Sequence, residues 1–261
     1  MTADFTSDEI MTVSAARMLR NGAICFVGIG LPSTAANLAR LLHAPDAVLI
    51  YESGPIGAKP AVLPLSIGDG SLAETADTVV STPEIFRYWL QGGRVDVGFL
   101  GAAQLDRFAN INTTVIGDYR NPKVRLPGAG GAPEISTSAK EVLVIVKQSR
   151  RSFVEKLDFI TSAGFLMGGD ARESAGITGR GPVAVITDLC ILRPDSTTRE
   201  LMVTSIHPEI SRDRIRANTG WEIRFSEECA TTEPPTGNEL TTLRDLLART
   251  AKAHGAAGVA A

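Results

Sequence analysis

The chain has 261 residues, of which 44% are apolar and 5% aromatic, and its formal net charge at pH 7 is −3. A chain of this length buries about 70–75% of its unfolded surface around one core. It contains neither an apolar run of about 18 residues, which a membrane span needs, nor the long basic tract of a dedicated nucleic-acid binder.

The first half of the chain predicts two helices and two buried strands. A capping box at residues 6–9 starts a helix that closes at Asn21–Gly22. The strand "AICFVGIG" then leads into a helix opened by Pro32–Ser33. The strand "AVLIY" follows and ends directly before Glu52. Residues 54–82 are rich in glycine and proline, and we expect an irregular segment there with at most a short hairpin.

The second half continues the alternation of strands and helices. Further buried strands are predicted over residues 95–102, 141–148, 182–188 and 200–207. Helices are predicted over residues 83–93, over 207–220 with Pro208 near the first turn, and from the cap Asn238 onward.

This alternation predicts an α/β fold, in which a mostly parallel open sheet carries helices on both faces. We expect one domain over residues 1–250 and a disordered tail over 251–261. The N-terminal stretch carries acidic residues where a signal peptide carries basic ones, so we expect a cytoplasmic protein. The cysteines Cys25, Cys190 and Cys229 lie far apart in the sequence, which indicates reduced thiols rather than a disulfide frame or a zinc site.

Three features are expected beyond the carboxyl ends of the strands, where ligands bind in parallel sheets. They are the loop 28–33 after the first strand, Glu52 after the next strand, and the loop 128–131, which precedes the strand predicted over 141–148. The first loop departs from the dinucleotide fingerprint, because Ser33 replaces the third glycine and Pro32 lacks an N–H. Each loop either offers backbone N–H donors to an oxyanion or a phosphate, or serves only as a turn. Lys123 and Arg125, just before the second loop, either meet an anionic ligand or are solvated surface charges.

Motifs for several other chemistries are missing. The sequence has no G-x-S-x-G elbow, no H-E-x-x-H and no P-loop, and its three histidines suggest no catalytic triad. The remaining carboxylate, Glu52, is a candidate general base, metal ligand or nucleophile, although no acidic or histidine cluster surrounds it in the sequence. A weakly basic nucleophile of this kind suits a thioester substrate, where each oxyanion formed would need backbone donors.

Several stretches of the chain resemble the second (B) subunit of class I coenzyme A transferases, in the glutaconate CoA-transferase branch. Within that branch the chain is especially similar to the B subunits that act on 3-oxoadipate, and the resemblance covers most of residues 10–220. The stretches that carry it are "NGAICFVGIGLPSTAANLARL", "YESGPIGAKPAVLPLSIGDG", "GAAQLDRFANINTTVIGDYRNPK", "RLPGAGGAPEI", "FVEKLDFITSAGF" and "CILRPD".

The resemblance implies the chemistry of the site. The glutamate of the E-S-G turn, here Glu52, would carry an acyl anhydride and then a glutamyl–CoA thioester. The amide of Ile29 and the amides of Gly130 and Gly131 would lie near the oxyanions. For CoA binding we expect contributions from Gly28, Gly30 and Gln104. Lys147, at the end of a predicted strand, either reaches the CoA phosphates or is a solvated surface charge.

The resemblance also implies partners. We expect a separate A subunit, a heterotetramer or larger assembly, and an active site at the A–B interface. CoA and acyl-CoA are expected as substrates, with no permanently bound cofactor, no metal, and no nucleic-acid or membrane partner. Ala109 stands in "RFANIN" where relatives usually have glycine, so a turn with positive φ there would cost roughly 1 kcal/mol.

The resemblance favours ping-pong transfer of CoA from succinyl-CoA to 3-oxoadipate, in the catabolism of aromatic compounds. Glutaconate or another dicarboxylate is the alternative acceptor. Hydrolysis of a CoA ester is disfavoured because hydrolytic relatives lack the E-S-G glutamate. A DNA-binding sensor related to sugar-phosphate-binding α/β domains is disfavoured as well, since nine residues before the first matched stretch leave no room for a helix-turn-helix.

Overall fold

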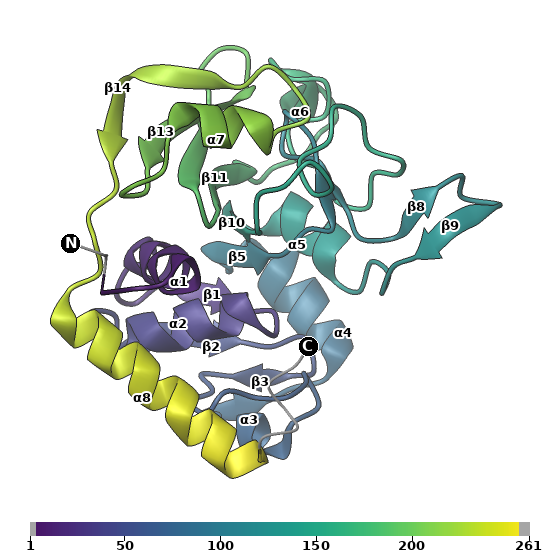
Figure 1. Ribbon diagram of the computed structural model, residues 1–261. Helices are drawn as coiled ribbons and strands as arrows, with labels where there is room; N and C mark the ends of the chain where they lie inside the picture. The colour runs from purple at the N-terminus through teal and green to yellow at the C-terminus, as the bar shows by residue number, and fades with distance from the viewer. Residues whose placement is uncertain (1–3, 256–261) are drawn as a thin grey trace.

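Five parallel strands form the centre of a ten-stranded sheet in the computed structural model, which describes residues 4–255 (Figure 1). In order across the sheet they are β2 (Val48–Ile50), β1 (Ile24–Phe26), β5 (Val97–Leu100), β10 (Glu141–Ile145) and β11 (Pro182–Ile186). Because all five run in the same direction, their carboxyl ends meet at one edge of the sheet.

The outer strands of the sheet include antiparallel pairs. Beyond β11 lie β12 (Cys190–Pro194) and β13 (Leu201–Ile206), each antiparallel to the strand before it, and then β14 (Arg224–Thr231), which is parallel to β13. Beyond β2 lie the antiparallel strands β3 (Pro55–Ile56) and β4 (Thr78–Val79), in the segment expected to be irregular. The predicted α/β class with a mostly parallel sheet is confirmed, with antiparallel margins added to it.

Helices cover both faces of the sheet. One face packs against α1 (Ser7–Arg17), α2 (Leu31–Leu41) and α8 (Gly237–His254). The other packs against the π-helix η1 (Ile85–Leu90), α5 (Ala132–Ser138) and α7 (Arg212–Ala217). The smaller elements are α3 (Gly70–Glu74), α4 (Thr82–Glu84), α6 (Ala171–Ser174) and two hairpins, β6 (Gln104–Leu105) with β7 (Ile111–Asn112) and β8 (Val115–Gly117) with β9 (Pro122–Arg125). The β8–β9 hairpin projects from the body of the molecule (Figure 1).

The central strands are apolar on both sides, which explains why they read as continuous hydrophobic runs in the sequence. Side chains alternate along a strand, so in β1 Cys25 packs with α1 and α2 while Phe26 packs with η1 and α5. Strand β10 repeats the pattern, with Leu143 on the first face and Val144 on the second. Both faces are therefore buried, as a parallel sheet between two helical layers requires.

Local signals placed the first helix correctly. The Thr6 hydroxyl accepts a hydrogen bond from the Glu9 N–H, and the Glu9 carboxylate accepts one from the Thr6 N–H, so the predicted capping box is present. The regular helix ends at Arg17, somewhat before Gly22, which adopts a φ of +73°.

The predicted helix over 207–220 is wrong at its start. Helix α7 begins only at Arg212, where the Ser211 hydroxyl caps it by accepting from the Arg214 N–H. Pro208 lies outside the helix, and Glu209 has a φ of +64°, which a right-handed helix excludes.

The last helix also differs from the prediction. Its cap is Thr236 rather than Asn238, because Thr236 and Glu239 form a reciprocal capping box. Helix α8 runs to His254, and so the first residues of the predicted tail 251–261 are helical. The remainder, 256–261, lies outside the described residues.

Two strands of the main sheet were not predicted, β12 and β14, and neither were the strands of the two small hairpins, β6–β7 and β8–β9. Strand β14 reads "RFSEECAT" and is largely exposed, so it lacks the hydrophobic pattern of a buried strand. The helix expected over 83–93 is mostly a π-helix, in which the N–H groups of Gln91 and Arg94 bond to carbonyls five residues earlier. Among residues 4–255, every helix is too short or too polar to cross a membrane.

Candidate active site

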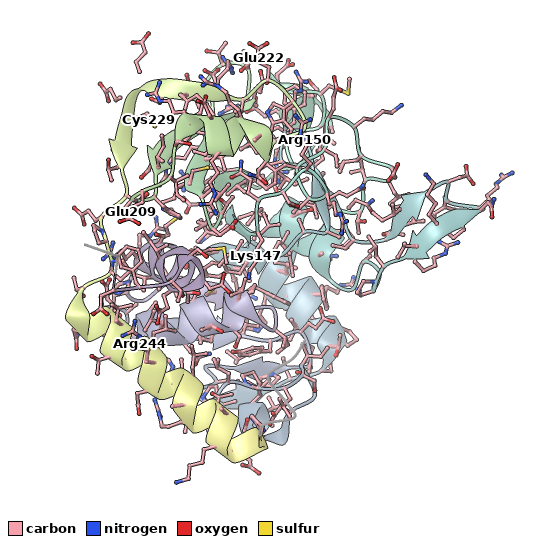
Figure 2. All side chains as sticks on the ribbon, in the orientation of Figure 1. Lys147, Arg150, Glu209, Glu222, Cys229 and Arg244 are labelled. Carbon is pink, nitrogen blue, oxygen red and sulfur yellow. The ribbon has the colours of Figure 1, made fainter. Side chains whose placement is uncertain are left out.

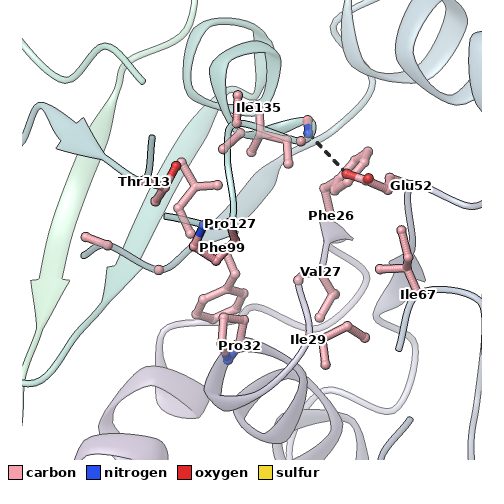
Figure 3. A pocket seen from close by; sticks show the side chains of 18 of the residues that line it. Phe26, Val27, Ile29, Pro32, Glu52, Ile67, Phe99, Thr113, Pro127 and Ile135 are labelled. Carbon is pink, nitrogen blue, oxygen red and sulfur yellow. Dashed lines mark hydrogen bonds between the residues drawn. The ribbon is translucent and has the colours of Figure 1, made fainter. Parts of the chain in front are cut away.

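The strand order reverses at β1. The chain passes from β1 to β2 on one side, and β5 then lies on the other side of β1. In parallel sheets such a reversal leaves a crevice at the carboxyl ends of the strands, where ligands bind. A cavity of about 410 Å³ lies there, lined by residues that follow β1, β2 and β5 (Figure 3).

Glu52 reaches this cavity from a tight turn after β2. The preceding residue, Tyr51, is fully buried, and its hydroxyl lies 3.3 Å from the Ser33 Oγ. Burial raises the pKa of Tyr51, which therefore stays neutral. The turn closes when the Gly54 N–H donates to the Tyr51 carbonyl at 3.0 Å. A Cβ at Gly54 would lie 2.1 Å from the Val80 carbonyl oxygen, so only glycine fits there.

The second glycine loop contacts the Glu52 carboxylate. The Gly131 N–H donates to Glu52 Oε2 at 3.2 Å, the one hydrogen bond that this side chain accepts within residues 4–255 (Figure 3). A Cβ at Gly131 would lie 2.8 Å from that oxygen and 2.6 Å from Phe86 Cζ. The bare backbone at Gly131 thus lets an amide reach the carboxylate, and Phe86 forms an apolar wall beside it.

The first glycine loop lines the same cavity. Gly28 and Ile29 both face it, together with Pro32 at the start of α2 (Figure 3). Gly30 does not line it; with a φ of +82° it forms the N-cap of α2 and borders a neighbouring cavity against α8. The structure therefore brings Glu52 together with the turn at Gly28–Ile29 and the turn at Gly130–Gly131.

Besides Gly30, two further predicted CoA-binding residues, Lys147 and Gln104, are not at this cavity. The Lys147 ammonium lies 2.9 Å from an Asp8 carboxylate oxygen on the outer surface, a contact that raises its pKa (Figure 2). Gln104 is buried, donating to Asp158 at 3.0 Å and accepting from Asn112 at 2.7 Å. Both side chains make these contacts away from the cavity. A role for either in CoA binding stays a prediction.

A second hollow of about 380 Å³ adjoins Glu52. Glu52, Gly130 and Gly131 line both hollows, and the other residues of the second one are Phe86, Gln91, Pro133 and Glu134. Glu52 and the second glycine loop thus border two spaces, and groups bound in either space would lie close to the carboxylate. The described residues hold no group of three or more histidine, cysteine or acidic side chains able to bind a metal ion.

Sequence reasoning missed two residues of the site, Phe86 and Thr113. Phe86 belongs to the π-helix and gave no signal beyond its helical context. Thr113 lies in the stretch "NINTTVIGDY" that carries the family resemblance, and that resemblance was the available signal. The cavity wall around Thr113 and Glu52 is otherwise apolar or bare backbone, including Phe26, Phe99 and Ile135. Such a wall strengthens electrostatic interactions by excluding water.

Known proteins share both the sequence and the fold. The chain is 69% identical to the B subunit of the 3-oxoadipate CoA-transferase of Pseudomonas knackmussii, over 97% of this chain and 98% of the relative. It is 34% identical to the B subunit of the glutaconate CoA-transferase of Acidaminococcus fermentans, over 86% of each chain. The crystal structure of glutaconate coenzyme A-transferase from that organism superimposes with a TM-score of 0.87 at 31% identity, covering 93% of this chain and 95% of the other.

The family model described as "Coenzyme A transferase" matches residues 9–218, most of the chain. The resemblance inferred from the sequence motifs is confirmed, and so is the expectation of an enzyme of the CoA-transferase class. This chain belongs to the coenzyme A transferase family.

Proposed function

We propose that this chain is the B subunit of a cytoplasmic CoA-transferase that moves CoA from succinyl-CoA to 3-oxoadipate in the catabolism of aromatic compounds. Its partner is a separate A subunit, in a heterotetramer or larger assembly. The observation that carries the proposal is the Glu52 carboxylate, held by the Gly131 amide beside two hollows at the carboxyl ends of the strands. The relative at 69% identity supports the choice of acceptor.

The first half of the reaction begins when a Glu52 oxygen attacks the thioester carbonyl carbon of succinyl-CoA. The C–S bond breaks, CoA leaves as the thiolate, and Glu52 and the succinyl group form a mixed anhydride. The thiolate then attacks the Glu52 carbonyl carbon, which expels succinate and leaves a glutamyl–CoA thioester.

The second half repeats these steps with the acceptor. The carboxylate of 3-oxoadipate attacks the glutamyl–CoA carbonyl, forming a new anhydride and releasing the CoA thiolate. The thiolate attacks the 3-oxoadipyl carbonyl, so that 3-oxoadipyl-CoA departs and the Glu52 carboxylate is restored. Atoms and charge balance without any added cofactor.

The backbone of the two turns explains how the oxyanions are stabilised. When the thiolate attacks Glu52, negative charge develops on a Glu52 oxygen, and the Gly131 N–H is already directed at one of them. When Glu52 attacks a substrate, the charge develops on the substrate oxygen, and we expect the turn at Gly28–Ile29, which lines the cavity, to stabilise it. One well-placed donor is worth about 2.7–4 kcal/mol of transition-state stabilisation.

The composition of the cavity supports the need for a partner chain. A dicarboxylic acyl group carries a free carboxylate, yet none of the residues lining the 410 Å³ cavity is lysine, arginine or histidine. A buried carboxylate requires compensating charge or hydrogen bonds. We expect the A subunit to supply the positive charge and to close the open side of the cavity.

The direct test is to trap the enzyme-bound intermediate. The A–B complex is incubated with succinyl-CoA, treated with hydroxylamine or borohydride, digested and analysed by mass spectrometry. We expect the modification on the peptide that contains Glu52. An unmodified Glu52 in a complex that turns over would refute the covalent mechanism.

An acceptor screen then tests the substrate. We expect 3-oxoadipate to give a higher kcat/KM than glutaconate with succinyl-CoA as donor. Faster turnover with glutaconate would reassign the acceptor while leaving the chemistry intact. Turnover without any carboxylate acceptor would indicate hydrolysis instead.

A further inference from the structure

Two oxygen-bearing side chains line the cavity, Glu52 and Thr113. They come from opposite walls: Glu52 follows β2, whereas Thr113 lies between β7 and β8 (Figure 3). The other lining residues are glycine, alanine, proline, valine, isoleucine, leucine or phenylalanine. Thr113 is therefore, apart from Glu52, the one residue lining the cavity whose side chain carries a polar atom.

The main chain of Thr113 is fixed on both sides. Its N–H donates to the Thr161 Oγ1 at 2.9 Å, and its carbonyl accepts from the Gly128 N–H at 2.9 Å. The Thr113 hydroxyl, in contrast, is buried and has no hydrogen-bond partner within residues 4–255. The neighbouring Thr114 hydroxyl lies 2.7 Å from the Thr161 hydroxyl and is satisfied.

A buried hydroxyl without a partner is unfavourable, and native proteins seldom keep one without a reason. Threonine occupies a few staggered rotamers, and rotation about its Cα–Cβ bond exchanges the hydroxyl with the methyl group. Since the Thr113 side chain borders the cavity, this rotation turns its hydroxyl toward a ligand without moving the fixed main chain.

We propose that Thr113 is a specificity-determining residue whose hydroxyl donates a hydrogen bond to the second carboxylate of a dicarboxylic acyl group. The inference rests on the proposed function, which places the reacting carbonyl at Glu52 and hence the far end of the acyl chain toward the opposite wall. A monocarboxylic acid of the same length offers no oxygen there, and leaves the hydroxyl unpaired. Such a loss is the kind of difference that polar sites discriminate well.

The test compares two acceptors in the A–B complex at saturating succinyl-CoA. The dicarboxylate is 3-oxoadipate, and the matched monocarboxylate is 3-oxohexanoate, which has a methyl group in place of the second carboxylate. In ping-pong kinetics the kcat/KM for the acceptor reports the second half-reaction alone. The variants are Thr113→Val, which keeps the shape without the hydroxyl, Thr113→Ser, which keeps the hydroxyl, and the control Thr114→Val.

For Thr113→Val we expect the kcat/KM for 3-oxoadipate to fall about 10- to 100-fold, mainly through KM, because a hydrogen bond to a charged group is lost. The kcat/KM for 3-oxohexanoate should change less than about 2-fold, since that acid makes no such bond. Thr113→Ser should keep the wild-type ratio of kcat/KM between 3-oxoadipate and 3-oxohexanoate. Thr114→Val should change kcat/KM for both acceptors by the same factor, because the Thr114 hydroxyl bonds to Thr161 within the protein.

Two results separate this inference from the function beneath it. If the wild-type complex transfers CoA to 3-oxoadipate and Thr113→Val keeps the same ratio between the two acceptors, the role of Thr113 is overturned alone. If the wild-type complex does not use 3-oxoadipate, the proposed function fails and the inference fails with it. Loss of the preference in Thr113→Ser as well would also overturn the hydrogen bond, and this variant covers the case in which Thr113→Val does not fold.

Discussion

The centre of the sheet and its antiparallel side treat polar groups in opposite ways. At the centre, Glu52 accepts one hydrogen bond from the described chain, and the Thr113 hydroxyl accepts or donates none. On the antiparallel side, His207 bonds through Nδ1 to the Thr232 hydroxyl at 2.9 Å and through Nε2 to the Thr187 carbonyl at 2.8 Å. The carboxylate and the hydroxyl at the centre keep unused hydrogen-bonding capacity, whereas both ring nitrogens of His207 are bonded within the protein.

Whether a polar group is fully hydrogen-bonded within the protein distinguishes structural from functional groups here better than the type of residue does. Histidine and cysteine are common catalytic residues, yet burial lowers the pKa of His207 and raises the pKa of Cys190 to about 12. His207 therefore stays neutral and Cys190 stays a thiol at neutral pH, which makes both unreactive. Glu52 and Thr113 are the better candidates for contact with a ligand, because a ligand can supply the hydrogen bonds that the protein does not.

The largest expected effect is at Glu52. Glu52→Gln keeps the size of the side chain and an oxygen for the Gly131 N–H but removes the nucleophile, so we expect kcat to fall by at least about 10⁴-fold. Glu52→Asp leaves the carboxylate one methylene short and should cost about 100-fold. Because the side chain is only partly buried, thermal melting should stay within about 2 °C of the wild type. Activity above a tenth of the wild type in Glu52→Gln would contradict nucleophilic catalysis.

The next effect concerns the amide that faces Glu52. Gly131 has a φ of −81°, so alanine suits its backbone, and the cost of Gly131→Ala comes from the contacts of the new Cβ with Glu52 and Phe86. We expect a loss of about 100-fold in kcat/KM, because the carboxylate is displaced. Gly237→Ala is the matched control: its Cβ would meet nothing within 4 Å, at the start of α8. Equal activities of Gly131→Ala and Gly237→Ala would show that Gly131 makes no contribution to catalysis.

Sequence reasoning recovered what depends on local or periodic signals. The apolar runs of the parallel strands predicted the fold class. Glu52 directly after a strand and the two glycine loops predicted which residues line the cavity, while their catalytic roles stay predictions. What it missed depends on distant contacts. Phe86 lies on a π-helix and packs against Phe26, and Lys147 is held at the surface by Asp8; both partners lie far away in the sequence. Strand β14 is formed by pairing with β13 and not by its own polar residues.

On the antiparallel side, titration of His207 should make the free energy of unfolding depend on pH without affecting catalysis. The pKa of His207 lies below its ordinary value of 6.5 in the folded chain, because burial disfavours the charged imidazole. Between these two pKa values the unfolded chain binds a proton that the folded chain does not, so acidification through 6.5 lowers the free energy of unfolding. His207→Gln should melt below the wild type at pH 7.5, and the gap should narrow by a few degrees at pH 5.5.

The measurement is thermal melting of both proteins at the two pH values, with kcat per folded enzyme recorded at pH 7.5. We expect kcat to stay within about 2-fold of the wild type, since His207 does not line the cavity. A gap between the melting temperatures that widens on acidification would reverse the sign and show that His207 is charged in the folded chain. A large loss of kcat would show that the two regions are coupled.

The smallest effect is expected at Ala109, where the suspected turn has a φ of +56° in a fully buried position. Ala109→Gly should raise the free energy of unfolding by about 1 kcal/mol, because glycine tolerates the positive φ. Loss of the buried methyl group should lower it by about 0.8 kcal/mol. The greater conformational entropy of glycine in the unfolded chain should lower it by a further 0.4–1 kcal/mol or so. Urea unfolding should therefore change by less than about 1 kcal/mol, and kcat/KM by less than about 2-fold. The next residue, Asn110, holds the turn through the Asp106 carboxylate and the Leu166 carbonyl. A tenfold change in kcat/KM in Ala109→Gly would mean that this turn, and not Asn110, sets the geometry of the segment that carries Thr113.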